Sequence, residues 1–368
     1  MNNLEPELPR TRCGYPPNEV IQSLEKILGQ AGTEATGRAL HFTADLVCSG
    51  GINNLFRILW EYALLHIGLA SPRVFVYLNH RIKEIENLMK TLPDETAYSY
   101  ELFQLRIGEL ILVLRDAPTR TLISWPQVGQ ETHEQGWIRG AVIDPISESA
   151  ALRRTWNPQG DFALLRTVGG NISKAISDGS TERALFWIKW LLEEDLIARK
   201  VNKTGLTTIK RGPENLSANQ RNDASFFVLH LYNEMYKEIA QKGLIRMNEE
   251  FQMLLHIWKY PPKGLGTTAK KQILILLTQI LIEVPKWKIP AALPLIKDPI
   301  YLSNAIKQIP KFFNEVLSYE VPSKSGELAK AFKTRGGAPA KPKEKKKVAL
   351  TQMEAYDFAM DAYMKKLG

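Results

Sequence analysis

The sequence predicts an all-α protein built from two helical halves. Apolar residues recur at spacings of three and four along most of the chain, and no stretch shows a convincing period-2 alternation of apolar and polar residues. The chain is 368 residues long and 44% hydrophobic, which is enough for a sizeable core. Frequent prolines and glycines in the middle interrupt the helical pattern and divide it in two.

The N-terminal half follows a proline-containing extended arm, residues 1–17, and spans residues 18–117. Its predicted helices cover 18–29, 36–68 with a break at Ser49-Gly50-Gly51, Ser71 to about Lys90, and Pro93-Asp94 to about Asp116. Ser71-Pro72 supplies an N-cap and a first-turn proline. In the last of these helices one stripe, typical of a core-facing surface, consists of Phe103, Ile107, Leu110 and Leu114.

Residues 118–170 form a Pro/Gly-rich irregular region that connects the halves. A connection this long is usually functional, mobile or contains short elements of its own. The C-terminal half, residues 171–322, has predicted helices near 171–198, 223–242, 247–259, 268–284 and 299–319, the last one opened by Asp298-Pro299. The apolar run 273–284 is too short and too interrupted for a membrane span, so it predicts a buried helix.

A short sequence similarity links the two halves. Residues 55–60 (LFRILW) and 185–190 (LFWIKW) share four of six residues at an offset of 130, each just after a glycine-containing turn. A duplicated helical unit explains this similarity, and so does the common composition of aromatic-rich core helices. The sequence leaves both interpretations open.

Charge and cysteine content limit the functional classes. Residues 324–347 carry nine Lys or Arg and two Glu, which is +7 of the net charge of +9, so the rest of the chain is nearly neutral. Cys13 and Cys48 form neither a disulfide framework nor a thiolate zinc motif, and a reducing compartment is expected. The N-terminus has no secretory pattern, so we expect a protein that is not secreted.

No catalytic, metal or cofactor motif is present. The six histidines are scattered, no nucleophile elbow occurs, and the acidic cluster 193–195 is typical of a solvated helix face. Residues 263–270 (KGLGTTAK) superficially resemble a phosphate-binding loop, but the glycine spacing and the lysine position do not fit, which favours a turn between helices. We therefore expect no enzyme, no cofactor and no small-molecule substrate.

Two internal segments are candidates for contact surfaces. The connecting region carries Trp125, Trp137 and Trp156 near Arg139, Arg153 and Arg154, a combination that favours protein contact over nucleic acid because acidic residues are interspersed. In residues 199–221, six cations face a single acid, Glu214, which indicates either a solvated basic loop or an anion contact.

The C-terminus combines a basic linker with a helix. Residues 323–349 are rich in Lys, Ala, Gly and Pro, which predicts a disordered linker. In residues 350–368 a capping box begins at Thr351, and the expected partner-binding stripe on this amphipathic helix is Met353, Tyr356, Met360, Tyr363 and Leu367. The helix docks either on its own body or on a partner. In the alternative, the contacts to nucleic acid come from Lys341, Lys343, Lys345, Lys346 and Lys347.

Two stretches, 38–82 and 182–200, resemble a poorly characterised helical protein of nucleocytoplasmic large DNA viruses, and 177–194 is similar to the helical collar of clamp-loader-related ATPases. The first resemblance implies a viral protein located in the virion or the host cytoplasm. We expect a non-enzymatic structural or assembly protein whose partners are other viral structural proteins. The alternative is a nucleic-acid-binding accessory factor for viral replication or packaging.

Overall fold

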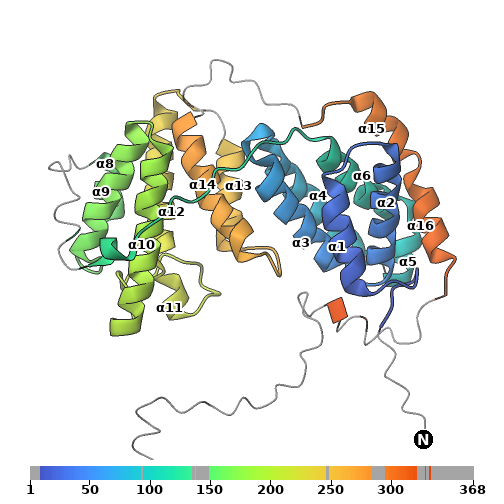
Figure 1. Ribbon diagram of the computed structural model, residues 1–368, viewed down its shortest axis with the longest axis horizontal. Coiled ribbons are helices and arrows are strands. Elements are labelled where there is room, and N and C mark those ends of the chain that lie inside the picture. The colour runs from blue at the N-terminus through green and yellow to red at the C-terminus, as the bar shows by residue number, and fades with distance from the viewer. Residues whose placement is uncertain are drawn as a thin grey trace, which may run out of the picture.

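The fold is all-α, as predicted. The computed structural model describes residues 9–92, 94–134, 137, 149–245, 248–283, 285, 295–320, 328 and 331–332. Among these, the regular elements are helices, and the β-type pairing is an isolated bridge between Asp161 and Thr207. Figure 1 shows two groups of helices side by side, with α8 to α14 in one group and α1 to α6 in the other.

The N-terminal helices match the predicted elements, except that the single helix predicted from Pro93-Asp94 to about Asp116 is divided in two at Tyr100, whose backbone is extended. They are α1 (Pro17–Leu28), α2 (Thr33–Cys48), α3 (Ile52–Tyr62), α4 (Arg73–Thr91), α5 (Asp94–Ser99) and α6 (Glu101–Asp116). After α3 the chain continues through a π turn, η1 (Ala63–Ile67), and a 3₁₀ turn, η2 (Gly68–Ala70). The α2–α3 break lies where predicted, because Gly50 adopts φ +86°, a conformation that side chains with a Cβ rarely adopt. The predicted stripe of α6 is fully buried.

The C-terminal group contains additional short elements. It comprises η3 (Gln130–His133), α8 (Ala150–Thr155), α9 (Ala163–Ser177), α10 (Thr181–Asn202), α11 (Ala218–Arg221), α12 (Ala224–Gln241), α13 (Asn248–Lys259) and α14 (Thr267–Glu283). The single helix expected over 171–198 is instead two helices, separated at Gly179 with φ +75°. The apolar α14 is a buried helix, as predicted. Within the described residues, no helix combines the length and apolarity that a membrane crossing requires.

The irregular region 118–170 contains more helix than expected. Its last part forms α8 and the first eight residues of α9, so Gly169 and Gly170 lie inside a helix instead of interrupting it. A Cβ on Gly169 would lie 2.7 Å from Leu152 and 3.1 Å from Phe227. This glycine therefore allows α9 to approach α8 and α12 closely.

The two groups share one packing scheme. In the first group α6 contacts α2, α3, α4 and α5, and in the second α14 contacts α9, α10, α12 and α13. The two similar hexapeptides lie in α3 and α10, which follow the turns at Gly50 and Gly179. Trp60 and Trp190 are both buried. Both interpretations of the repeated hexapeptide, duplication and common composition, stay open.

The last two helices return to the N-terminal group. Residues 299–317, which sequence order placed in the C-terminal half, form α15 (Pro299–Ile306) and α16 (Ile309–Leu317). They pack against α2 and α6 (Figure 1). Asp298 caps α15 as predicted, since its carboxylate accepts hydrogen bonds from the backbone of Ile300 and Tyr301. The Tyr301 hydroxyl lies 2.6 Å from the Thr36 hydroxyl of α2.

The two groups are joined by contacts at the centre of the molecule. Helix α13 packs against α4, and α14 packs against η1 and η2. Arg120 bonds Glu283 at 2.8 Å, and the backbone N–H of Gly266 donates to Glu61 of α3 at 2.7 Å. Helices α13 and α14 and the turn between them therefore form the second group's side of the junction.

Segments near residue 12 and near residue 330 contribute to the body. In the predicted arm, the backbone N–H groups of Arg12 and Cys13 donate to Ser49 and Asp45, which fixes this segment to the end of α2. In the predicted linker, Leu328 and Phe332 are buried and join the core. The prediction that the linker starts at 323 is therefore wrong for these two apolar side chains, whose i,i+4 spacing suits burial on one helix face.

Candidate functional site

The residues predicted to bind partners lie outside the described part of the chain. These are the helix stripe at 353–367 and the lysines at 341–347, and they stay predictions. The described residues offer internal contact networks and two surfaces on which a function can be built.

The tryptophans of the connecting region are half-buried and pack against the core. The ring of Trp137 lies 6.1 Å from that of Trp187 and 6.2 Å from that of Trp190, both on α10. The guanidinium carbon of Arg166 lies over the Trp156 ring, 5.1 Å from the ring centre. Each of the three tryptophans also keeps part of its surface exposed, so the expectation that they contact a partner stays a prediction.

The acidic cluster 193–195 is divided between two structural contacts. His133 stacks on Trp190, with ring centres 5.3 Å apart, and its ring nitrogens bond Glu194 at 2.8 Å and Glu193 at 3.4 Å. Asp195 is buried, pairs with Arg199 at 2.7 Å and accepts the N–H of Leu206. The expected solvated face therefore anchors the connecting region and the loop after α10. Among the described residues, no cluster of His, Cys, Asp and Glu could hold a metal ion.

The basic segment 199–221 is largely structural. Arg211 pairs with Asp161, and Arg199 donates to the backbone carbonyls of Asn219 and Asn222. Arg221 donates to the carbonyl of Gly212. Three of the six cations thus hold the loop together, which removes them from any continuous anion-binding surface.

The glycine turn at 263–270 connects α13 to α14. The N–H of Gly266, one of those that a phosphate would need, donates to the Glu61 carboxylate. Lys270 lies 4.9 Å from the ring centre of Trp258 instead of reaching into the turn. The turn therefore docks the second group on α3, and the geometry gives no cradle for a nucleotide.

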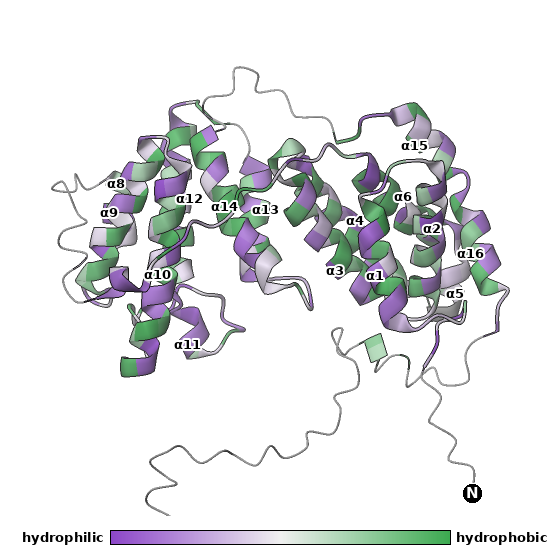
Figure 2. Ribbon diagram, in the orientation of Figure 1, coloured by the Kyte–Doolittle hydropathy of each residue, from purple (hydrophilic) through white to green (hydrophobic). Residues whose placement is uncertain are grey.

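The first surface is an apolar patch at the end of α10. Leu196, Ile197 and Val201 have exposed fractions of 59%, 41% and 83%. Lys200 lies among them and is exposed as well. Figure 2 shows hydrophobic residues at the free end of this helix, and we call these three side chains the α10 patch. Neighbouring exposed apolar side chains of this kind mark sites of protein association.

The second surface is a groove along α13. Three cavities of about 580, 320 and 280 Å³ adjoin one another, because the largest shares Gln252, Leu255 and Lys259 with the second, and His256 and Tyr260 with the third. Helix α4 forms one wall and α12 the other. We call this depression the α13 groove.

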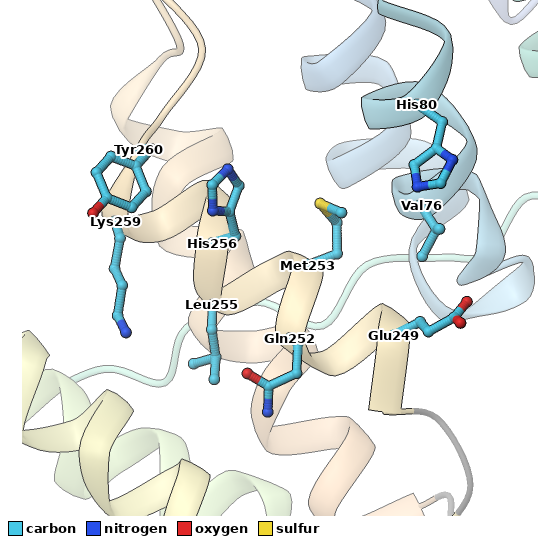
Figure 3. Close-up of a pocket in the computed structure, with 9 residues that line it drawn as sticks. All are labelled: Val76, His80, Glu249, Gln252, Met253, Leu255, His256, Lys259 and Tyr260. Atoms are coloured by element: carbon cyan, nitrogen blue, oxygen red, sulfur yellow. The ribbon is translucent and has the colours of Figure 1, made fainter. Parts of the chain in front are cut away.

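Side chains from both helical groups meet in the α13 groove. In Figure 3, His80 of α4 and Met253 of α13 face each other across the largest cavity, and Lys259 extends from the other side of α13. Lys83, Lys263, Asn53 and Asn79 line the smallest cavity. Two acids, Glu249 and Glu86, line the groove as well.

The electrostatics of the groove are dominated by cations near the end of α13. Burial lowers the pKa of His256, and the charges of Lys83 and Lys259 lower it further. Burial also lowers the pKa of His230, with Arg211 as the next cause. Both imidazoles therefore hold a proton less readily than a free histidine does, first because burial disfavours the charged form and second because cations lie nearby.

No sequence pattern predicted this groove. Lys83 is far from Lys259 and Lys263 along the chain, and the contact between α4 and α13 brings them to one surface. Comparisons with protein-family models, curated proteins and solved structures found no match. The resemblances drawn from 38–82, 182–200 and 177–194 therefore stay predictions.

Proposed function

We propose that this chain is a non-enzymatic assembly protein of a large DNA virus that works by binding other proteins. The observation that carries the proposal is the α10 patch, where three large apolar side chains are exposed at one end of a helix. Burying them against a partner would contribute about 1.5–3 kcal/mol for each side chain that becomes fully covered. The viral setting rests on the resemblance of residues 38–82 and 182–200.

The polar side chains that drew attention in the sequence are used for internal hydrogen bonds, which supports a binding role over a catalytic one. His133, Asp195 and Arg211 each have hydrogen-bonding partners within the chain that fix loops to helices. The C-terminal stripe predicted from the sequence supplies a second apolar surface for the same kind of contact.

A capture experiment tests this proposal. Tagged full-length chain and its Leu196→Asp/Val201→Asp variant are expressed in infected cells, and the proteins that co-purify are identified by mass spectrometry. We expect viral structural proteins with the parent chain and their loss with the variant. The matched control is Ile300→Asp, an equally drastic change at a 76% exposed position on α15. Equal capture by all three chains would contradict the proposal.

A further inference from the structure

We propose that the α13 groove binds single-stranded nucleic acid, with Lys83, Lys259 and Lys263 contacting phosphates and Tyr260 stacking on a base. This site is separate from the α10 patch and from the basic linker. The argument rests on charge, on the aromatic ring and on the shape of the groove.

The three lysines have the properties of phosphate contacts. None of them forms an ion pair with another residue of the described chain, whereas many arginines of the body do. Glu86 lines the same cavity as Lys83 and Lys263, and Glu249 lines the same cavity as Lys259, so three lysines stand against two carboxylates in the groove. Because the body outside the linker is nearly neutral, this gathering is a local positive surface on an otherwise balanced protein.

Tyr260 provides a stacking face. Its exposed fraction is 50%, and it lines both the largest and the smallest cavity. The His256 ring lies 5.1 Å away and supports one side of it. Exposed aromatics between cations are the common feature of surfaces that bind single strands, because every base has a face that can stack.

The shape of the groove favours an extended, unpaired chain. The cavities follow α13, which is about 18 Å long at 1.5 Å per residue. Asn53 and Asn79 line the same cavity as Lys83 and Lys263 and supply amide groups that can hydrogen bond to base edges. A paired base has its faces covered by its neighbours in the helix, so stacking on Tyr260 requires a single strand.

The test measures binding of a fluorescein-labelled 12-nucleotide oligothymidylate to the full chain by anisotropy, between 50 and 200 mM salt. The groove variant is Lys83→Gln/Lys259→Gln/Lys263→Gln. The control is Lys26→Gln/Lys307→Gln/Lys311→Gln, which removes the same charge at exposed positions away from the groove. Because each phosphate contact contributes about 0.7 to the salt slope, we expect the groove variant to lower the slope by about 2 and the affinity by at least tenfold. The control should change the affinity less than threefold.

A second pair of variants isolates stacking from charge. Tyr260→Ala should weaken binding at least fivefold, and Tyr260→Phe should stay within twofold of the parent. Three outcomes would overturn the proposal. These are equal losses in the two lysine triples, an unchanged affinity in Tyr260→Ala, and groove-dependent binding of polyglutamate without binding of the oligonucleotide. The last result would assign the groove to an acidic protein.

Discussion

Arg211 and Asp161 form a two-point ion pair inside the C-terminal group. Both guanidinium NH₂ groups donate to the carboxylate, and the two side chains are only 9% and 0% exposed. Thr207 also donates to Asp161, and Arg211 reaches the carbonyl of Thr155 at the end of α8. The pair therefore holds the loop after α10 against the loop before α9.

Replacing Arg211 should destabilise the fold strongly. Arg211→Met leaves a buried carboxylate without its cation, and we expect the free energy of unfolding to fall by about 3–5 kcal/mol, measured by urea denaturation. The control is Arg183→Met, which removes a pair with Asp178 whose side chains are 55% and 37% exposed. Its effect should stay below about 1 kcal/mol. A loss that small for Arg211→Met would show that the pair is dispensable.

The two thiols should resist alkylation and make stability pH-dependent. Burial raises the pKa of Cys13 and of Cys48 to about 12, and the charge of Asp45 adds to the effect. Below pH 9 both thiols are protonated in the folded and unfolded states alike. Between pH 9 and 12 only the unfolded chain ionises, so the free energy of unfolding should fall as the pH rises through this range.

This behaviour can be measured with iodoacetamide and with denaturation curves at pH 8, 9 and 10. Folded protein should react far more slowly than protein in urea, because a thiol with a pKa of about 12 is about one-thousandth ionised at pH 9. A Cys13→Ser/Cys48→Ala variant should lose part of the decline in stability above pH 9. Equal alkylation rates in the folded and urea-treated chain would disprove the prediction.

The packing of α16 against α6 depends on a glycine. A Cβ added to Gly108 of α6 would lie 2.5 Å from a side-chain carbon of Ile309, so Gly108→Ala should cost about 1–3 kcal/mol and loosen α16. Gly37→Ala is the control in the same interface, because there the nearest atom, on Phe312, is 3.7 Å away. Hydrogen exchange in residues 309–317 should rise in the first variant only. Unchanged exchange in both would mean that α16 can shift at no cost.

Deleting residues 350–368 should abolish association with partner proteins and leave the body folded. The predicted stripe of Met353, Tyr356 and Leu367 belongs to this segment, which lies outside the described residues. Circular dichroism would report the fold, and co-purification from infected cells would report association. Normal association of the truncated chain would exclude the helix as a docking element.

Much of the fold could be predicted because its signals are local. Helical spacing, the Asp298 cap at the start of α15 and the glycine break after α2 all depend on neighbouring residues. Where glycine serves packing instead of a turn, as at Gly169, the same residue misled the prediction of α9. The single helix predicted near 299–319 was wrong as well, because the chain forms two helices there and Pro310 is a first-turn residue of α16.

The surfaces could not be predicted because they depend on long-range contacts. The position of α15 and α16 on α2 and α6, and the meeting of Lys83 with Lys259, follow from how helices distant in sequence pack. The tryptophans were correctly singled out as contact residues, but composition alone could not distinguish an internal contact from an external one.

The return of α15 and α16 to the first group has a consequence for synthesis on the ribosome. Residues 309–317 pack on α2 and α6. The half that is translated first therefore has an uncovered apolar face until residue 317 has emerged. The second group has all its helices once residue 283 is out, well before that. The N-terminal group is thus translated first but completed last. A chain truncated before residue 299 would expose the apolar surface of α6 on which Ile309 packs.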